Sequence, residues 1–284
     1  MTLGELYRKE RKTLSDAGVE SPAFDADCLF RQVFGLDRQQ RILQSQEQAD
    51  AEKVKEYEDC VAARAGGRPL QYILGKWPFM DFSLFVGEGV LIPREETELL
   101  VYTAAEHLKG SRHPHVADLC SGAGAVALGL ASLIPGAQVT AAEYYEEAYS
   151  YLVRNIKETG FANVMPAFLD VLDPRSAEQF SALDCIVSNP PYVCAGELPA
   201  LQREVRREPP TALDGGEDGL LFYRAIARNW LPLLKPGGCA AVEIGEGQAP
   251  EVAELFESAG LSCIRVDRDF NGIERVVSGI QEIT

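Results

Sequence analysis

The stretch Asn189-Pro190-Pro191-Tyr192 constrains this chain more than any other, because it interrupts an apolar run at residues 183–187. Two consecutive prolines cannot donate the hydrogen bonds of a strand ladder, and each one moves the residue before it away from helix. A strand must therefore end here in a stiff, extended turn. In such a turn the side chain of Asn189 and the carbonyls of Asn189 and Pro190 face outward, with the ring of Tyr192 beside them.

This turn supplies two hydrogen-bond acceptors at one place. An amide oxygen and a backbone carbonyl together can bind both hydrogens of a planar –NH2 group. A nitrogen bound in this way points its lone pair at whatever lies opposite. A plain proline turn after a strand would have the same sequence, so the rest of the chain has to decide between the two interpretations.

A glycine-rich loop upstream gives the second signal. Residues 115–120 have the pattern of a short buried strand, residues 121–124 of a glycine loop and residues 125–133 of an apolar helix. This order opens a nucleotide-binding βαβ unit, in which glycine lets the backbone approach the ligand. Glu143 ends the next strand-like run, at about the 20-residue spacing where an acidic side chain binds a ribose diol. Asp170 ends the third run, where it could accept a hydrogen bond from an adenine amino group.

Two cofactors fit such a unit, a nicotinamide dinucleotide and S-adenosylmethionine. A dinucleotide needs a third small residue at the start of the helix, and Ala127 could serve. However, the sequence has no second glycine-rich mononucleotide turn and no obvious acid or base for hydride transfer. An amide clamp at the end of the fourth strand suits methyl transfer from a sulfonium, so the sequence favours S-adenosylmethionine.

Alternating strands and helices predict an α/β fold, a Rossmann-like seven-stranded methyltransferase sheet with an antiparallel C-terminal hairpin, plus a small N-terminal helical domain. The last two strands follow each other through residues 270–272, which indicates the hairpin at a sheet edge. The strands are expected near residues 115–120, 138–143, 163–169, 183–189, 239–245, 261–267 and 274–280.

The N-terminal part has helical periodicity, beginning with a capping-box pattern at Thr2 and Glu5. A helix is also expected over residues 93–109, and a hairpin strand over 80–86. The expected core of the N-terminal helices consists of Leu14, Phe24, Leu29, Phe30, Val33, Ile42 and Leu43. We therefore predict three parts: a helical substrate-docking domain at 1–67, a linker and β-hairpin at 68–92, and a methyltransferase domain at 93–284.

The formal net charge of −16 argues against a nucleic-acid substrate. Tight binding to nucleic acid relies on Lys and Arg neutralising phosphates, and no basic stripe with interleaved aromatic residues is present. A negative surface instead suits a cationic cofactor and a basic protein partner.

The seven cysteines form no Cys-x-x-Cys pair, and Cys120, Cys185, Cys239 and Cys263 fall in strand-like runs. This pattern predicts reduced core thiols and neither a disulfide set nor a zinc site. The three histidines precede the first strand of the sheet and are interpreted as an exposed linker, so no metal is expected. The N-terminus lacks the layout of a secretory signal, which predicts a cytoplasmic protein without a membrane segment.

The chain resembles the protein-(glutamine-N5) methyltransferases that modify the Gly-Gly-Gln glutamine of peptide-chain release factors. The resemblance covers nearly the whole length. Besides the turn at 189–192, it rests on residues 68–75, 91–98, 208–209, 212–213, 219–220, 243–245, 248 and 269–275. It implies transfer of a methyl group from S-adenosylmethionine to the side-chain amide nitrogen of that glutamine, with the release factor as protein partner. We expect a monomer that does not contact nucleic acid or a membrane directly.

By this resemblance, Asn189 and Pro190 hold the substrate amide, and the glycine loop with Glu143 holds the cofactor. The candidate catalytic residues are Asn189, Pro190 and Tyr192, and Pro191 joins them as a substrate-binding residue. The candidate cofactor-binding residues are Cys120, Ser121, Gly122, Ala123, Gly124, Glu143, Asp170, Val171 and Asn189.

Three of these positions depart from the family's pattern. Glu143 stands where the family usually has Asp; it is one methylene longer but chemically equivalent. Cys120 replaces the first glycine of the loop, so it must take a negative φ or tolerate modest strain. Val171 stands where the family often has an aromatic residue that stacks on adenine.

Two alternatives to the proposed class remain: a methyltransferase acting on the exocyclic amine of a nucleobase, and a non-catalytic binding module.

Overall fold

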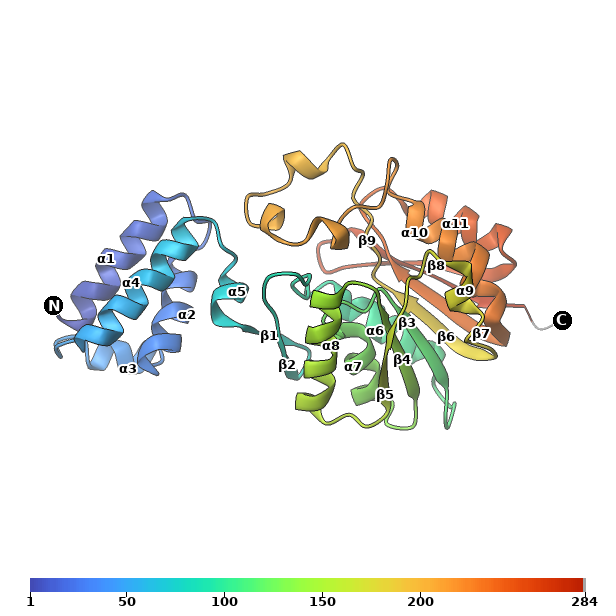
Figure 1. Ribbon diagram of the computed structural model, residues 1–284, viewed down its shortest axis with the longest axis horizontal. Helices are drawn as coiled ribbons and strands as arrows, with labels where there is room; N and C mark the ends of the chain where they lie inside the picture. Colours follow the sequence, from blue (N-terminus) through green and yellow to red (C-terminus); the bar gives the residue numbers. More distant parts are fainter. Residues whose placement is uncertain (283–284) are drawn as a thin grey trace. The chain divides into compact units, whose positions relative to one another are not determined.

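The computed structural model describes residues 1–282, which divide into two compact units (Figure 1). Unit 1 contains Met1–Lys76 together with the short segment Gln202–Arg207. Unit 2 contains Trp77–Leu201 and the chain from Glu208 onward. The chain therefore leaves unit 2 once, contributes one short segment to unit 1, and returns.

Unit 1 is helical. The Thr2 hydroxyl accepts a hydrogen bond from the Glu5 N–H, and the Glu5 carboxylate accepts one from the Thr2 N–H, so the predicted capping box is present. Leu14, Leu29 and Phe30 are fully buried, as predicted. The helices are α1 (Leu3–Asp16), α2 (Pro22–Phe34), α3 (Arg38–Leu43), α4 (Ala51–Ala65) and α5 (Leu70–Leu74).

Three residues assigned to this core are on the surface instead. Phe24, Ile42 and Leu43 are 55%, 57% and 84% exposed. The inward position of the short helix α3 is taken by Arg41, whose guanidinium stacks 3.4 Å from the centre of the Tyr7 ring. Successive helical residues point about 100° apart, so Ile42 and Leu43 turn away from that contact.

A buried ion pair joins the two pieces of unit 1. Arg64 donates to Asp25 at 2.6 Å and to Glu204 at 2.9 Å, and both Asp25 and Arg64 are buried. Glu204 lies in the segment Gln202–Arg207, which explains why this segment belongs to unit 1. Loss of one partner of such a pair leaves an uncompensated charge and is strongly destabilising.

The hairpin of β1 (Lys76–Phe79) and β2 (Phe82–Phe85) lies at the start of unit 2, apart from Lys76, which is the last residue of the first piece of unit 1. The prediction of one strand over residues 80–86 was wrong at its start, because Met80 has a φ of 51° and lies in the turn. The seven-stranded sheet follows in the order β5-β4-β3-β6-β7-β9-β8. Its strands are β3 (His115–Leu119), β4 (Gln138–Glu143), β5 (Val164–Phe168), β6 (Leu183–Ser188), β7 (Leu234–Glu243), β8 (Leu261–Arg268) and β9 (Glu274–Gln281).

The predicted sheet is confirmed, including its antiparallel hairpin. Strands β3 to β7 pair in parallel, while β9 is antiparallel to both β7 and β8. Cys263 departs from the prediction of a core thiol: it is exposed on the edge strand β8. Within the described residues all seven cysteines are free.

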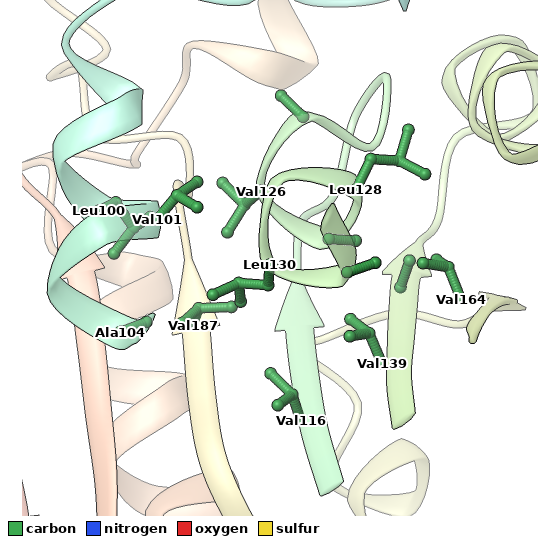
Figure 2. Close-up of a cluster of buried hydrophobic side chains, with 14 of the residues drawn as sticks. Leu100, Val101, Ala104, Val116, Val126, Leu128, Leu130, Val139, Val164 and Val187 are labelled. Atoms are coloured by element: carbon green, nitrogen blue, oxygen red, sulfur yellow. The ribbon is translucent and has the colours of Figure 1, made fainter. Parts of the chain in front are cut away.

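Helices cover both faces of the sheet, and successive side chains of each strand point to opposite faces. Val116 and Ala141 pack in a cluster with the first three helices of the unit, whereas their neighbours Ala117 and Ala142 pack with the later ones. Figure 2 shows the first cluster, in which Leu100 and Val126 lie above the strands. The helices are α6 (Thr97–His107), α7 (Ala125–Leu133), α8 (Glu146–Thr159), α9 (Pro174–Ala177), α10 (Leu221–Ala225) and α11 (Ala249–Ser258).

Helix α6 starts later than the sequence pattern suggested. Its first residue is Thr97, and only residues 95–96 form a turn before it, while residues 93–94 belong to no helix or strand. His107 ends α6 half-buried, which differs from the exposed linker expected for the histidines. None of the helices in residues 1–282 is long and apolar enough to cross a membrane.

Candidate functional site

A pocket opens at the carboxyl ends of the parallel strands of unit 2. Residues that follow β3, β4, β5 and β6 line it, which is where α/β sheets of this type bind ligands. The lining residues predicted from the sequence are Cys120, Ser121, Gly122, Ala123, Glu143, Asp170, Val171, Asn189 and Pro191.

The loop after β3 has an unusual backbone. Gly122 and Gly124 have φ values of 55° and 87°, and Cys120 has a φ of 59°. Of the two possibilities for Cys120, the negative φ was wrong, since a non-glycine residue here occupies the left-handed region with some strain. A side chain at Gly124 would meet Leu152 Cδ1 at 2.7 Å, so the glycine allows the loop to pack closely against α8. Gly124 is also the N-cap residue of α7. It does not line the pocket.

Glu143 fastens the glycine loop to the end of β4. Its carboxylate accepts hydrogen bonds from the N–H groups of Gly122 at 2.9 Å, Tyr144 at 2.7 Å and Tyr145 at 2.9 Å. Burial raises the pKa of Glu143 despite these three donors, which act in the opposite direction. Glu143 is 7% exposed and lines the pocket, so it both shapes the loop and presents a carboxylate to the pocket.

Asp118, which the sequence analysis did not single out, lies beneath the same loop. Its Oδ2 accepts from the Ser121 hydroxyl at 2.6 Å and from the Ala127 N–H at 3.0 Å. Its Oδ1 is buried and has no hydrogen-bond partner among the described residues. Burial raises the pKa of Asp118 to about 7. A pocket-lining carboxylate with an unpaired oxygen suits a cationic ligand group.

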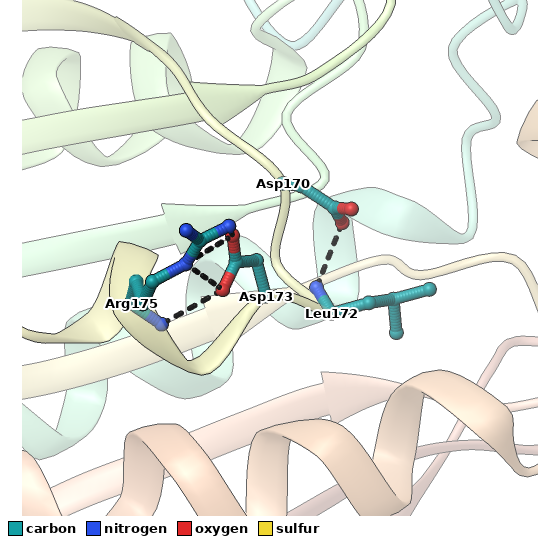
Figure 3. Close-up of polar contacts among 4 residues, drawn as sticks. All are labelled: Asp170, Leu172, Asp173 and Arg175. Atoms are coloured by element: carbon teal, nitrogen blue, oxygen red, sulfur yellow. Dashed lines mark hydrogen bonds and ion pairs between the residues drawn. The ribbon is translucent and has the colours of Figure 1, made fainter.

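Asp170 and Val171 follow β5. The Asp170 Oδ1 accepts a hydrogen bond from the Leu172 N–H at 2.8 Å. Asp173 and Arg175 form a separate ion pair nearby (Figure 3). The Val171 carbonyl accepts from the Trp230 Nε1–H at 3.0 Å. These bonds fix the turn at the rim of the pocket, where Val171 supplies an apolar surface.

The proline turn follows β6, whose last residue, Ser188, donates its hydroxyl to the Leu119 carbonyl at 2.7 Å. The Asn189 Nδ2 donates to the Thr97 hydroxyl at 3.1 Å. Both Asn189 and Thr97 line the pocket. With its –NH2 bound to Thr97, Asn189 has its amide oxygen available as an acceptor.

Pro190 and Tyr192 are not among the pocket-lining residues, unlike Pro191. Pro190 is buried, and the half-buried Tyr192 packs against the cluster on the second face of the sheet. Burial raises the pKa of Tyr192 to about 12. Gly215 allows close packing on the turn, since a side chain there would meet Tyr192 Cα at 2.8 Å.

A buried carboxylate also anchors the opposite wall. Glu208 accepts from the Ile92 N–H at 2.9 Å and forms an ion pair with Arg94. Glu208 is 3% exposed. This contact holds the chain after residue 208 next to residues 92–94, and Arg94 and Pro209 both line the pocket.

The sequence analysis did not assign a role to several lining residues. They come from segments that lie far apart along the chain, although residues 91–98 and 208–209 carried the family resemblance. They include Gly89, Leu91, Pro93, Arg94, Thr97, Asp118, Tyr144, Tyr145, Pro209, Thr211, Ala212 and Phe222. Among the described residues no group of three or more His, Cys, Asp or Glu side chains could hold a metal ion.

The sheet order and the ligand pocket define an α/β methyltransferase. The model of the methyltransferase small domain matches residues 95–217. The crystal structure of the hMettl16 catalytic domain shares the fold with a TM-score of 0.57 at 16% identity, covering 78% of this chain and 81% of that one.

More specific similarities extend to the N-terminal helices. The model of the PrmC N-terminal domain matches residues 5–75. A release factor glutamine methyltransferase of Geobacter sulfurreducens is 39% identical over 282 residues, which cover 98% of this chain and 96% of the relative. One of Moorella thermoacetica is 35% identical over 261 residues, covering 92% and 91%. The chain belongs to the release factor glutamine methyltransferase family, and the family predicted from its motifs is confirmed.

The raised pKa of Asp118 predicts how stability depends on pH. An unfolded Asp titrates near 3.9, whereas folded Asp118 titrates at about 7. Between these values the folded protein retains a proton that the unfolded chain releases, so Asp118 makes stability fall as pH rises. Asp118→Asn removes this contribution. In urea unfolding without ligand, the stability of the variant minus that of the wild type should increase from about pH 4 to pH 7. A difference independent of pH would contradict the assignment.

Proposed function

We propose that this chain transfers a methyl group from S-adenosylmethionine to the side-chain amide nitrogen of the glutamine in the Gly-Gly-Gln motif of a peptide-chain release factor. The observation that carries the proposal is Asn189, whose –NH2 is bound to Thr97 inside the pocket, so that its oxygen can accept from a planar amide. The family membership agrees with this acceptor.

The pocket residues fit the cofactor. S-Adenosylmethionine carries a positive amino group, a ribose diol and an adenine ring, and its sulfonium supplies the methyl group. The unpaired Oδ1 of Asp118 suits the amino group, and the carboxylate of Glu143 suits the diol. Asp170 and Val171 at the rim would hold adenine by an acceptor and by apolar contact. Cys120, Ser121, Gly122, Ala123 and Gly124 form the loop around it.

The clamp would accelerate methyl transfer by orienting the substrate amide. A neutral amide nitrogen is a weak nucleophile, because its lone pair is delocalised into the carbonyl. The Asn189 oxygen would accept one N–H bond of the substrate amide, and the Pro190 carbonyl is proposed as the second acceptor although Pro190 is not among the pocket-lining residues. Together they would aim the amide nitrogen at the methyl group, which reduces the entropic part of the barrier. The same acceptors stabilise these N–H bonds as they become more acidic in the transition state. Pro191 and Tyr192 stiffen the turn that carries both acceptors.

The nucleobase alternative is not favoured. It would require a surface that neutralises phosphates, whereas this chain carries a formal net charge of −16. The similarity to hMettl16 concerns the fold alone. Monomeric state and a cytoplasmic location stay predictions.

Mapping the methylated residue tests the proposed substrate directly. The enzyme is incubated with labelled S-adenosylmethionine and a folded release factor, and the label is located by mass spectrometry. One methyl group should appear on the side chain of the Gly-Gly-Gln glutamine, and replacement of that glutamine in the release factor should abolish labelling. Label in RNA or DNA, with none in the release factor, would instead support the nucleobase alternative.

Asn189→Ala tests the clamp. The variant should bind S-adenosylmethionine with nearly unchanged affinity, while kcat falls by about 100-fold or more, since one oriented acceptor is lost from the transition state. Asn163→Ala is a control, because Asn163 donates to the Ala137 carbonyl away from the pocket. It should retain kcat. Equal losses of cofactor affinity and of kcat in Asn189→Ala would contradict the clamp.

Residues 1–67 are proposed as the substrate-docking domain. The apolar side chains of Phe24, Ile42 and Leu43 are exposed on unit 1 and could contact a protein substrate. Replacing Ile42 and Leu43 together by Ser should raise KM for the release factor roughly 5-fold or more, with KM for the cofactor unchanged. Met165→Ser, which removes a 67% exposed apolar side chain from unit 2, is the control. Equal effects of both changes would argue against docking on unit 1.

A further inference from the structure

One side-chain amide outside the pocket holds the end of the proline turn. The Gln248 Nε2 donates to the Tyr192 carbonyl at 3.0 Å and to the Gly219 carbonyl at 3.4 Å. Gln248 is the N-cap residue of α11, in the connection that follows β7. It is half-buried and does not line the pocket. Gln248 therefore contacts the turn without lining the site proposed for the two substrates.

The orientation of the Gln248 amide is fixed by its own partners. Its Oε1 accepts from the Gly245 N–H at 2.9 Å, and a backbone N–H can only donate. The amide nitrogen must then point to the two carbonyls, which can only accept. Exchange of the oxygen and the nitrogen would set like groups against each other at every one of these contacts. The Tyr192 carbonyl thus has a defined donor.

Two glycines leave room for this contact. A side chain at Gly219 would meet both the Gln248 Nε2 and the Tyr192 carbonyl oxygen at 2.5 Å. A side chain at Gly245 would meet the Gln248 Oε1 at 2.9 Å. Both distances are too short for a Cβ atom, so a larger residue at either position would push the amide away from the turn.

The contact at Tyr192 anchors the second end of the proline turn. The first end is held by β6, whose Ser188 hydroxyl donates to β3 at 2.7 Å. Between the ends, the two prolines have fixed φ angles, because the pyrrolidine ring restricts that rotation. Few backbone rotations therefore remain that could move the Asn189 oxygen or the Pro190 carbonyl.

We propose that Gln248 is a positioning residue for methyl transfer, which keeps the proline turn at one place in the pocket by holding the Tyr192 carbonyl. The inference rests on the proposed role of Asn189 and Pro190 as acceptors for the substrate amide. An error of about 1 Å in the position of such groups can cost about 100-fold in rate.

The proposed cofactor site does not depend on this contact. The residues after β3, β4 and β5 that are proposed to bind S-adenosylmethionine have hydrogen bonds of their own, which do not involve Gln248. Loss of Gln248 should therefore lower kcat and leave cofactor affinity nearly unchanged.

Two substitutions of Gln248 test the proposal. Gln248→Met keeps a similar length but removes the amide, so kcat on the release factor should fall about 10-fold to 100-fold, with a nearly unchanged Kd for S-adenosylmethionine in calorimetry. Gln248→Glu, ionised at about pH 8, can still accept from the Gly245 N–H but has no hydrogen for the Tyr192 carbonyl. It should lose about as much kcat as Gln248→Met.

Asn163→Leu is the matched control. Asn163 is also half-buried, and its Nδ2 donates to the Ala137 carbonyl at 3.0 Å, away from the pocket. This variant should retain the wild-type kcat. Wild-type kcat in either Gln248 variant, a loss of cofactor affinity as large as the loss of kcat, or an equal loss of kcat in Asn163→Leu would overturn the proposal. A wild type that does not methylate the glutamine would instead contradict the proposed function.

Gly219→Ala tests the same contact from the other side. The added methyl group would enter the space between Gln248 and Tyr192, and the φ of 73° at Gly219 adds backbone strain. Gly160→Ala controls for the strain, since Gly160 has a φ of 72° and no neighbouring atom within 4 Å of the added carbon. Both variants should lose stability in urea unfolding, but kcat should fall about 10-fold or more in Gly219→Ala alone. Equal kcat values in the two variants would overturn the role of the contact.

Discussion

Buried carboxylates hold the pocket of this enzyme together. A loop that leaves the end of a parallel strand has N–H groups without strand partners, and such groups need acceptors when they are buried. Glu143 accepts hydrogen bonds from the N–H groups of the glycine loop and of Tyr144, which precedes α8. Asp118 accepts from an N–H group in the first turn of α7, and Glu208 accepts from the Ile92 N–H. Each carboxylate thus fixes one wall of the pocket.

The same carboxylates link structure to chemistry. Desolvation raises the pKa values of Asp118 and Glu243 to about 7, so both retain protons at a pH where an exposed carboxyl is ionised. The Asp118 Oδ1 and the Glu243 Oε2 are buried and have no hydrogen-bond partner among the described residues. Groups whose pKa values are shifted in this way are common in functional sites, because the buried environment that shifts the pKa also excludes water.

The sheet could be predicted from the sequence because each buried parallel strand consists of a short run of apolar residues. Residues 183–188, ended by two prolines, gave the position of β6, and the glycine loop gave the turn after β3. The exposure of Ile42 and Leu43 could not be predicted, since it results from the stacking of Arg41 on Tyr7. Periodicity identifies an apolar face but does not show whether a charged side chain occupies the inward position.

Part of the site was predictable in the same local way. Gly122, Glu143 and Asn189 stand at the ends of strands, and parallel strands bring such ends together. Thr97 could not be assigned from the sequence, because its partner Asn189 lies 92 residues away and only the packing of α6 on the sheet brings them into contact. Glu243 belongs to a stretch that carried the family resemblance, but its burial could not be predicted, since an acidic residue that ends a strand is ordinarily solvated.

The left-handed loop residue Cys120 places a thiol in the wall of the pocket that is proposed to hold the methyl donor. A thiolate is a far better nucleophile than an amide and would compete for the methyl group. Desolvation, together with the negative charge of Glu143, raises the pKa of Cys120 well above its usual value. A raised pKa favours the protonated, weakly reactive thiol, which would disfavour transfer of the methyl group to Cys120.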